Sequence, residues 1–465
     1  MAAKKHKQPS VTVGQQTELE ITGLGHAGEG VGRVNDFAIF VPGTIPGDQI
    51  LAKIQEVKRN HGRASIIKVI RSAAGRVAPE CVVAGDCGGC QLQHMAYESQ
   101  LEWKRQLVVD ALTRIGKFEE PLVQPVIGMA HPCGYRNKVQ YPMGLVGGKV
   151  ALGFYRRGTH AIVPIEECAN THPLCNKALQ VVSYLLAEIG LVPYDEITGD
   201  GLIRHLVCRV STAHNQLMVI LVTNGKEVSG MAKLVEKMRA ALPELVTVAQ
   251  NVNTKRTNVI MGEKTRILWG APYLIEELNG LKFAISPRSF FQVNSEQAAI
   301  LCHKVVEYAK IGQRTRALDC YSGTGSIALH LAREGAHVIG IEVVPEAIGD
   351  AKLNAELNHI SGAEFRVGRV ESELPGILEE GSVDMAVLDP PRKGCESEVL
   401  GALLQAKIPR LVYVSCNPSS LARDLAILAE GGYELREVQP VDMFPQTSHV
   451  ECVVLMSTRS PRRIF

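Results

Sequence analysis

A cysteine and an acidic residue follow apolar stretches in the C-terminal part of the chain, where the strands of a sheet are expected. Cys416 follows such a stretch in VYVSCNPSS and Asp389 follows another in VLDPPRKG, while a glycine-rich turn occurs earlier in LDCYSGTGS. In open α/β sheets the ligand crevice lies at the carboxyl ends of the strands. The sequence therefore predicts a nucleophile, an acid and a small-molecule site at successive strand ends of one parallel sheet.

The glycine-rich turn predicts the binding of a nucleoside-containing cofactor. Gly323 and Gly325 let the backbone approach a ligand closely, and Asp319 before them can hold a polar group. Glu342 ends the next predicted strand, where a carboxylate can accept hydrogen bonds from ribose hydroxyls. Because the turn lacks the full G-x-G-x-x-G pattern of dinucleotide sites, S-adenosylmethionine suits it better than a pyrophosphate. A tight turn with a purely structural role is the alternative.

Cys416 has two interpretations. A cysteine that ends a buried strand is commonly a small hydrophobic residue, but at the ligand edge of a sheet a thiolate can attack an electron-poor ring carbon. Glu451, in QTSHVECVVLM, begins another predicted strand. If the fold brings it to the thiol, its carboxylate can remove a proton as a general base. In the DPPRKG loop, Arg392 and Lys393 offer positive charges for phosphate.

Three further cysteines stand close together in CVVAGDCGGC. Cys81, Cys87 and Cys90 are separated by five and two residues, amid glycines that make poor core material. This spacing is typical of metal ligands, and soft thiolates select zinc or an iron–sulfur cluster. A fourth ligand must come from elsewhere, and the candidates are, in order, Cys168, Cys175 and Cys133.

Composition indicates a globular protein of the cytoplasm. Hydrophobic residues make up 46% of the chain and charged residues 21%, which is ordinary for globular domains. No apolar run reaches the roughly 18–20 residues of a membrane helix, and the basic start, MAAKKHKQPS, has no apolar core of a signal peptide. We therefore expect no membrane association, reduced thiols and no disulfide framework.

The length of 465 residues predicts two or three domains. Residues 9–70 are expected to form a small β-barrel of the oligonucleotide-binding type, with TELEITGL, FAIFVPG, QILAKIQEV and ASIIKVI as strands and HAGEGVGR as a turn. Residues 1–76 carry 11 Lys and Arg against 6 Asp and Glu. Such a local positive charge favours phosphate binding, although a solvated surface is the simpler alternative.

The remaining chain divides into two regions. Residues 71–275 mix strands and helices, which predicts an α+β module with antiparallel strands around the cysteines. Residues 97–115 have helical apolar spacing, and this helix can pack on either the cysteine module or the catalytic domain. Residues 276–465 alternate apolar strands with helices, which predicts a parallel sheet covered on both faces.

Taken in this order, the motifs resemble the RNA uracil-5-methyltransferase family, and in particular its bacterial 23S ribosomal RNA enzymes with an iron–sulfur cluster. The resemblance covers almost the whole chain and depends on CVVAGDCGGCQLQHM, SPRSFFQVN, LDCYSGTGS, LDPPRKG, VSCNP and HVECVVLM. It implies an N-terminal TRAM-like barrel, a central iron–sulfur module and a C-terminal Rossmann-like class I methyltransferase domain.

The resemblance also implies roles for single residues. Cys416 would be the nucleophile that adds to uracil C6, and Glu451 the base that removes the C5 proton. S-adenosylmethionine would be bound by Gln292, Tyr321, Glu342 and Asp389, and a [4Fe–4S] cluster by Cys81, Cys87, Cys90 and Cys168. Ser289 departs from the family, where some members carry an acidic residue in this motif, so it receives no role.

The first functional interpretation is S-adenosylmethionine-dependent methylation of uracil C5 in 23S rRNA by a monomer. A second keeps the chemistry but moves it to tRNA, and the cysteines favour ribosomal RNA. A third is a non-catalytic iron–sulfur RNA-binding protein, which the presence of Cys416 and Glu451 in their motifs disfavours. Which uridine is modified does not follow from the sequence.

Overall fold

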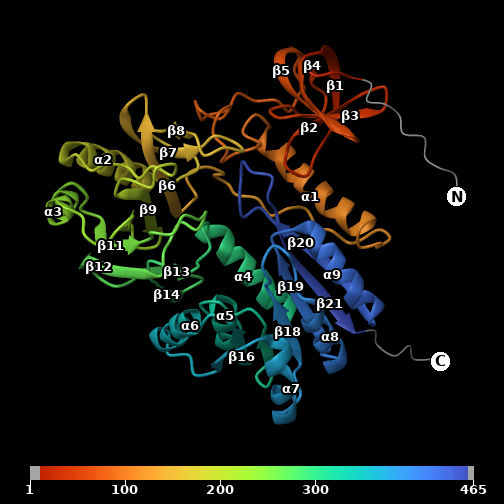
Figure 1. The fold of residues 1–465 in the computed structure, drawn as a ribbon. Helices are drawn as coiled ribbons and strands as arrows, with labels where there is room; N and C mark the ends of the chain where they lie inside the picture. Colours follow the sequence, from red (N-terminus) through yellow and green to blue (C-terminus); the bar gives the residue numbers. More distant parts are fainter. Residues whose placement is uncertain (1–10, 459–465) are drawn as a thin grey trace.

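A computed structural model describes residues 11–458 and shows three bodies along the chain (Figure 1). The basic residues of the N-terminal tail lie outside the described residues. A small barrel comes first, a seven-stranded sheet with two helices follows, and a second seven-stranded sheet with helices on both faces ends the chain. This order matches the predicted succession of barrel, α+β module and α/β domain.

The barrel is closed, with strand order β1-β2-β3-β5-β4. Its strands are β1 (Gln16–Leu24), β2 (Gly30–Val34), β3 (Phe37–Val41), β4 (Gln49–Val57) and β5 (His61–Arg71). The predicted turn HAGEGVGR is wrong in its second half, because β2 begins at Gly30. A side chain at that position would lie 1.9 Å from Thr44 Oγ1, so only glycine lets this strand close the barrel.

The basic surface of the barrel is smaller than its sequence suggests. The side chains of Lys58, Arg63, Lys68 and Arg71 are exposed on β4, β5 and their connections. Arg76, in contrast, donates hydrogen bonds to the buried Asp48 carboxylate at 2.5 and 3.0 Å and to a backbone carbonyl. This arginine therefore stabilises the exit from the barrel.

The central sheet has the order β12-β11-β10-β9-β6-β7-β8. Its strands are β6 (Lys138–Val146), β7 (Lys149–Tyr155), β8 (Ile162–Pro164), β9 (Ile203–Ser211), β10 (Gln216–Thr223), β11 (Leu245–Val252) and β12 (Lys264–Gly270). Helices α2 (Pro173–Ile189) and α3 (Met231–Ala241) pack on it. All neighbours are antiparallel, as predicted, except β10 and β11, which α3 connects as a parallel pair.

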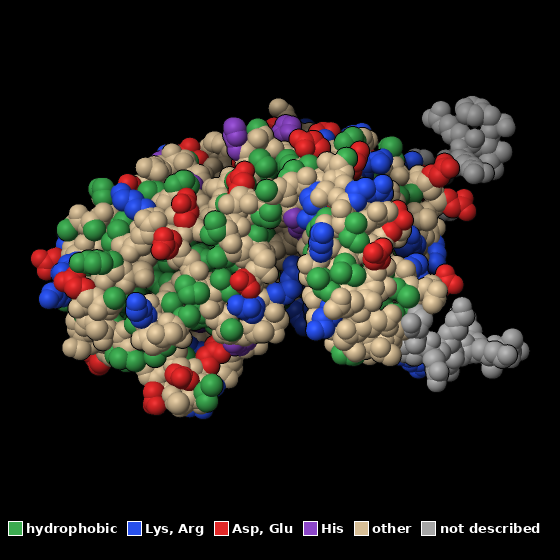
Figure 2. Space-filling view, turned by 90° about the horizontal axis from the view of Figure 1, so that it is seen from above, with side chains coloured by type: hydrophobic (Ala, Val, Ile, Leu, Met, Phe, Trp, Pro, Cys, Tyr) green, Lys and Arg blue, Asp and Glu red, His purple; other side chains and the backbone are tan. Residues whose placement is uncertain are grey.

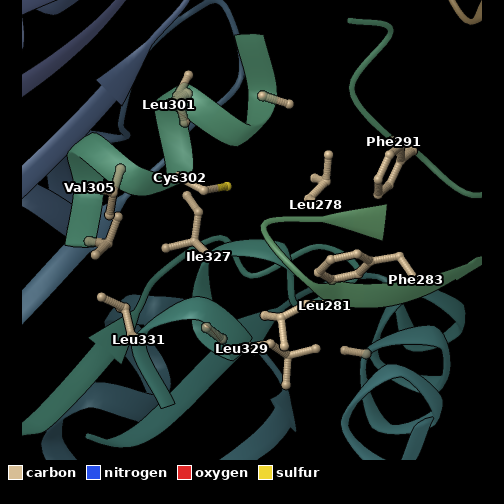
Figure 3. Close-up of a cluster of buried hydrophobic side chains, with 14 of the residues drawn as sticks. Leu278, Leu281, Phe283, Phe291, Leu301, Cys302, Val305, Ile327, Leu329 and Leu331 are labelled. Atoms are coloured by element: carbon tan, nitrogen blue, oxygen red, sulfur yellow. The ribbon is translucent and has the colours of Figure 1, made fainter. Parts of the chain in front are cut away.

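A hairpin and a helix join the central sheet to the C-terminal sheet. The change of pattern placed at residue 276 falls inside this hairpin, which consists of β13 (Leu274–Leu278) and β14 (Leu281–Ile285), and α4 (Ser295–Ala309) follows. Figure 3 shows Cys302 of α4 pointing toward Leu278 of the hairpin, with Ile327 of the next helix beside it. This shared hydrophobic core also takes in Met218 and Ile220 of the central sheet, so the two sheets are fixed to each other.

The C-terminal sheet has the order β17-β16-β15-β18-β19-β21-β20. Its strands are β15 (Arg316–Asp319), β16 (His337–Glu342), β17 (Ala363–Val367), β18 (Met385–Leu388), β19 (Arg410–Ser415), β20 (Tyr433–Val441) and β21 (Glu451–Thr458). Its helices are α5 (Ser326–Arg333), α6 (Pro345–Leu357), α7 (Val370–Glu380), α8 (Ser397–Ala406) and α9 (Pro418–Glu430). The prediction of a wholly parallel sheet is wrong for β21, which runs antiparallel to both neighbours. No helix separates it from β20, so the chain simply turns back.

Helix α1 (Tyr97–Arg114) covers almost the whole predicted helix and lies beside α9 and β20 (Figure 1). Its Val108 and Leu112 are fully buried in the core of the C-terminal sheet. The chain thus leaves the cysteine region, packs one helix on the C-terminal domain and returns to the central sheet. Among the residues that the structure describes, no helix is both long and apolar enough to span a membrane.

Candidate active site

A cavity of about 890 Å³ opens at the carboxyl ends of β15, β16 and β18. This is the edge at which the sequence predicted ligand binding. The four side chains assigned to the cofactor all line it, namely Gln292, Tyr321, Glu342 and Asp389. They come from four separate segments, so only the fold brings them together.

The glycine turn presents unsatisfied polar groups to this cavity. Asp319, the last residue of β15, is fully buried, and neither of its carboxylate oxygens has a hydrogen-bond partner. Burial and the nearby charge of Asp389 raise the pKa of Asp319 to about 7. The hydroxyl of Ser322 is likewise buried and unpaired. Buried polar groups without partners are costly, so a ligand with polar groups fits this end of the cavity.

Two backbone N–H groups hold the carboxylate of Glu342 at the end of β16. Its carboxylate accepts hydrogen bonds from the backbone N–H groups of Gly323 at 3.3 Å and Val344 at 3.0 Å. Gly325, with φ of 84°, begins α5 directly behind the turn. The carboxylate therefore has a fixed position between the glycine turn and the end of β16.

Cys416 and Glu451 lie side by side at the same sheet edge. Cys416 follows the last residue of β19, and the antiparallel pairing of Ser415 with Cys452 makes Glu451 the residue beside it on β21. Glu451 is 5% exposed, whereas the thiol is half-buried and so remains accessible. The two residues whose meeting the sequence left undecided are thus adjacent.

Burial dominates the electrostatics of this pair. It raises the pKa of the Cys416 thiol to about 11, and the neighbouring Glu451 carboxylate adds to the effect while Arg392 opposes it. Burial and the charge of Asp389 raise the pKa of Glu451 to about 8, again against Arg392. Asp389 lines the cavity, and its charge contributes to the raised pKa values of both residues, so the pair lies near the end of the cavity that Asp389 lines.

The loop that contains Asp389 is tied to the loop that contains Cys416. The carbonyl oxygen of Arg392 accepts hydrogen bonds from Asn417 Nδ2 and Ser420 Oγ, each at 3.0 Å. The oxygen of the same Asn417 side chain accepts from Ser419 N and caps helix α9. The Asn that follows the cysteine therefore fixes the distance between two strand ends.

His449 lies two residues before Glu451 in the chain. Burial and the charge of Arg392 lower the pKa of His449 to about 4, so its imidazole is neutral. Arg392 Nη2 lies 3.4 Å from His449 Nε2 and can donate to it. The imidazole also contacts the ring of Phe444 edge to face.

The four cysteines assigned to a cluster line a second cavity of about 410 Å³, here called the cysteine cavity, and they are Cys81, Cys87, Cys90 and Cys168. Cys175 is fully buried in α2 beside Cys208 and does not line it. Cys133 instead donates to Glu80 at 3.6 Å. Within residues 11–458, no three His, Cys, Asp or Glu side chains are placed as ligands of a single metal ion.

Two N–H groups already point at sulfurs of the cysteine cavity. Asn170 Nδ2 donates to Cys90 Sγ at 3.2 Å, and Gly89 N donates to Cys87 Sγ at 3.4 Å. The cavity wall also holds Thr171, whose buried hydroxyl has no partner. Four thiols, donors aimed at sulfur and an unpaired hydroxyl suit a group with several sulfur atoms. Asn170 and Thr171 could not be found from the sequence, because an Asn-Thr pair in a loop carries no recognisable signal.

A cavity at the carboxyl edge of an α/β sheet, a thiol beside a carboxylate and an N-terminal barrel of the nucleic-acid-binding type point to an RNA-modifying methyltransferase. The sequence profile of the tRNA (Uracil-5-)-methyltransferase family matches residues 210–459, and that of the TRAM domain matches residues 10–67. The chain belongs to this family of RNA uracil-5-methyltransferases, which use S-adenosylmethionine.

Relatives match over nearly their full lengths. The chain is 43% identical to an uncharacterized RNA methyltransferase of Halalkalibacterium halodurans, with 98% of this chain and 99% of that protein covered. It is 44% identical to another of Bacillus cereus, with 97% and 98% covered. Among solved structures it resembles the Pyrococcus abyssi tRNA (uracil-54, C5)-methyltransferase in complex with S-adenosyl-L-homocysteine. That match has a TM-score of 0.76 and 29% identity, over 95% of this chain and all of that one.

Proposed function

We propose that this protein methylates C5 of a uridine in 23S rRNA, giving 5-methyluridine, through a transient bond between Cys416 Sγ and C6 of the base. The observation that carries the proposal is the adjacency of Cys416 and Glu451 across β19 and β21. Both residues stand within electrostatic reach of Asp389, which lines the cofactor cavity. A nucleophile, a base and a methyl donor site therefore share one sheet edge.

The chemistry follows from the weak nucleophilicity of uracil C5. The thiolate of Cys416 adds to C6, the C5–C6 double bond opens, and the ring becomes an enolate. C5 then forms a bond to the methyl group of S-adenosylmethionine, whose sulfur keeps the electron pair of the broken bond. Glu451 takes the C5 proton, the C5–C6 double bond reforms, and the thiolate leaves. One difficult substitution is thereby divided into easier steps.

The resting site holds Cys416 mainly as a thiol. With a pKa raised to about 11 by burial and by Glu451, the thiol must first lose its proton to water, which reaches it because it is only half-buried, before it can add to C6. Arg392 favours the thiolate and so assists this step. Glu451, with a pKa raised to about 8, must be ionised to accept the C5 proton.

S-adenosylmethionine supplies the activated methyl group when it is bound. We assign the ribose hydroxyls to Glu342 and place Gln292, Tyr321 and Asp389 around the rest of the cofactor, because all four line the same cavity. The buried and unpaired carboxylate of Asp319 lies in the same lining and offers acceptors for a cationic or N–H group.

For the cysteine cavity we propose a [4Fe–4S] cluster held by Cys81, Cys87, Cys90 and Cys168. Four thiols line a space of about 410 Å³, and hydrogen-bond donors already face two of them. Sulfur-rich ligand sets of this kind hold zinc or iron–sulfur clusters. Methyl transfer moves no net electrons, so the role proposed for the cluster is to build the fold and position the RNA.

The barrel and the cysteine module are proposed to hold the RNA. A target base in folded RNA is stacked or paired, and turning it into a pocket costs roughly a few kcal/mol. Figure 2, seen from the side of the barrel, shows a hollow beside it with Lys and Arg side chains along its walls. Phosphate contacts there offset the cost of extruding the base.

Transfer RNA is the second candidate substrate. The match to a tRNA (uracil-54, C5)-methyltransferase over 95% of this chain favours it, whereas the four cysteines of the cysteine cavity favour ribosomal RNA through the resemblance described above. A methyl-transfer assay with separate 23S rRNA and tRNA separates the two. Methylation of tRNA alone would contradict the ribosomal assignment and leave the chemistry intact.

The catalytic part of the proposal is tested with Cys416→Ala and with RNA that contains 5-fluorouridine. The fluorine at C5 cannot be removed as a proton, so the wild-type protein is expected to stay covalently attached to the RNA. Cys416→Ala should neither methylate nor attach. A wild-type protein that methylates uridine but forms no adduct would contradict covalent catalysis.

A further inference from the structure

The loop between β20 and β21, residues 442–450, leads directly into the base Glu451 and is largely buried. Loops normally run over the surface because their backbone groups need partners. Here the partners are supplied by segments far away in the sequence. Tyr135 Oη donates to the carbonyl of Pro445 at 3.0 Å, and Asn294 Nδ2 donates to that of Met443 at 3.1 Å.

Gln446, at the tip of this loop, has a left-handed backbone with φ of 68°. The other described non-glycine residues with a left-handed backbone are exposed, whereas Gln446 is buried, and at a buried position surrounding contacts must hold such a backbone. Such outliers cluster at functional sites. The sequence gives no reason for a glutamine here, so its contacts must explain it.

Helix α1 supplies the first set of contacts. Gln100 Nε2 donates to Gln446 Oε1 at 2.9 Å, and Gln446 N donates to Gln100 Oε1 at 3.1 Å, so the two residues form a closed pair. Gln100 is fully buried and has no route to water. Four residues later in the helix, Lys104 donates to Asp442 Oδ1 at 2.6 Å, and both side chains are fully buried.

The segment after the cysteine motif supplies the second set. The carbonyl oxygen of Gln446 accepts from Gln91 N and Leu92 N, each at 3.0 Å. Ser448 N donates to Gln91 Oε1 at 3.3 Å. Gln91 follows Cys90 directly, so this clamp begins one residue from the cysteine cavity.

The barrel touches the same place. A methyl group added at Gly28, in the loop before β2, would lie 3.1 Å from Gln91 Cβ and 3.5 Å from Ser448 Cβ. The barrel, the cysteine module and α1 thus meet on one loop, five residues before the proposed catalytic base.

We propose that Gln446 is a positioning residue for Glu451: its strained backbone, held by Gln100 from one side and by Gln91 and Leu92 from the other, fixes the start of β21 so that the carboxylate stays beside Cys416. The inference rests on the proposed function and adds a residue that touches neither substrate nor cofactor. It also gives the barrel and the cysteine module a physical route to the catalytic base.

The chemistry provides a specific signature for this role. Methyl transfer to C5 comes before removal of the C5 proton, so a displaced Glu451 delays only the final step. The intermediate that accumulates has a methylated C5 and an intact bond between C6 and Cys416. A residue with a merely structural role would slow formation and release of this adduct alike.

The test uses the full protein, S-adenosylmethionine and RNA with ordinary uridine, and measures the protein fraction attached to RNA on a denaturing gel. For Gln446→Ala and Gln100→Ala we expect turnover to fall between roughly tenfold and a hundredfold, the range for a displaced catalytic group, with a clear rise in attached protein. Gln446→Gly should be milder than Gln446→Ala, because glycine adopts the left-handed backbone without strain. Glu102→Ala, on the exposed face of the same helix, is the matched control.

Two outcomes overturn the inference: attached protein at the level of the Glu102→Ala control, or a Gln446→Gly variant that is more impaired than Gln446→Ala. Thermal unfolding shows whether each variant is folded. The activities of Gln446→Gly and Gln446→Ala are compared at a temperature where both variants are fully folded. Glu451→Gln must accumulate the adduct in the same assay. If it does not, the proposed function fails, whereas failure of the glutamine variants alone removes only the role of Gln446.

Discussion

The proposed reactive pair, Cys416 and Glu451, consists of two groups whose pKa values are both raised by burial, to about 11 and about 8. Neither is in its reactive ionisation state in most molecules at neutral pH. A site of this kind avoids a permanently exposed thiolate, which oxidises readily. Its activity should therefore depend steeply on pH.

We expect kcat, which includes the final removal of the C5 proton, to rise with pH through about 8, because the raised pKa of Glu451 keeps the base protonated below that value. Arg392 lowers the pKa of both members of the pair, so Arg392→Gln should move the rising limb to higher pH. Lys393→Gln removes a charge from the same loop and serves as the control. If the rising part of the pH–rate profile shifted to lower pH in Arg392→Gln, the assigned effect of Arg392 on the two pKa values would be wrong.

Binding of the cofactor can be tested apart from the reaction. Glu342→Gln keeps the size of the side chain but removes the charged acceptor assigned to the ribose. Loss of a charge-assisted hydrogen bond is worth roughly 1.5–3 kcal/mol, so calorimetry with S-adenosylmethionine should show about tenfold or weaker binding. Unchanged affinity in a folded variant would remove Glu342 from the cofactor site.

At the scale of elements, the strands with chemistry at their ends were predictable, and the direction of β21 was not. Apolar stretches before Asp389 and Cys416 identify β18 and β19, since buried parallel strands read as continuous hydrophobic runs. The antiparallel course of β21 is decided by the absence of a helix after β20, and this course is what places Glu451 beside Cys416. The meeting of the two residues is therefore a property of topology rather than of any motif.

Glycines and polar residues account for most of the remaining differences between the predicted and the observed structure. Gly30 reads as a turn residue in the sequence, although it begins β2. Glycine is needed there to leave room for Thr44, and only the closed barrel brings Thr44 near. The contacts of Gln446 with Gln100 join positions 346 residues apart in the chain. Local propensity carries no information on such pairings.

Helix α1 offers a stability prediction of its own. Lys104→Met would leave the buried Asp442 carboxylate without its cation, which should cost about 3–5 kcal/mol in the free energy of unfolding. Asp110→Ala breaks the exposed ion pair with Arg114 on the same helix and should cost at most about 1 kcal/mol. Urea unfolding compares the two, and equal losses would contradict the buried pair as an anchor of the 442–450 loop.

At the scale of the whole molecule, three bodies contribute to one reaction. The shared core of hairpin β13–β14, α4 and α5 makes the central and C-terminal sheets one unit (Figure 3). The barrel and the cysteine module both contact the loop of Gln446, five residues before the proposed base Glu451. Under the proposal, RNA bound by the barrel is thereby coupled to the geometry of the active site.

Loss of the proposed cluster should affect stability and RNA binding more than chemistry. After anaerobic purification we expect iron and sulfide in a ratio close to one, and removal of the iron should lower the unfolding temperature and weaken RNA binding. Oxidising or reducing the intact protein should leave the single-turnover methylation rate unchanged, because methyl transfer moves no net electrons. Zinc without sulfide would contradict the cluster, and a rate that follows the redox state would contradict its structural role.

The exposed lysine and arginine side chains of the barrel can be tested for RNA binding. Lys68→Ala and Arg71→Ala should each weaken RNA binding and reduce the salt dependence by about one counterion, as expected for phosphate contacts. Both variants should methylate a free short RNA as before at saturating concentration. Binding that is insensitive to both substitutions would place the RNA on another surface.

The central claim is that Cys416 itself forms the bond to the pyrimidine. The most direct measurement traps the protein on RNA with 5-fluorouridine, digests both partners and locates the attached nucleotide by mass spectrometry. We predict a single modified peptide, with the nucleotide and its new methyl group on Cys416. Attachment at any other cysteine, or methylated RNA without attachment at Cys416, would contradict the account.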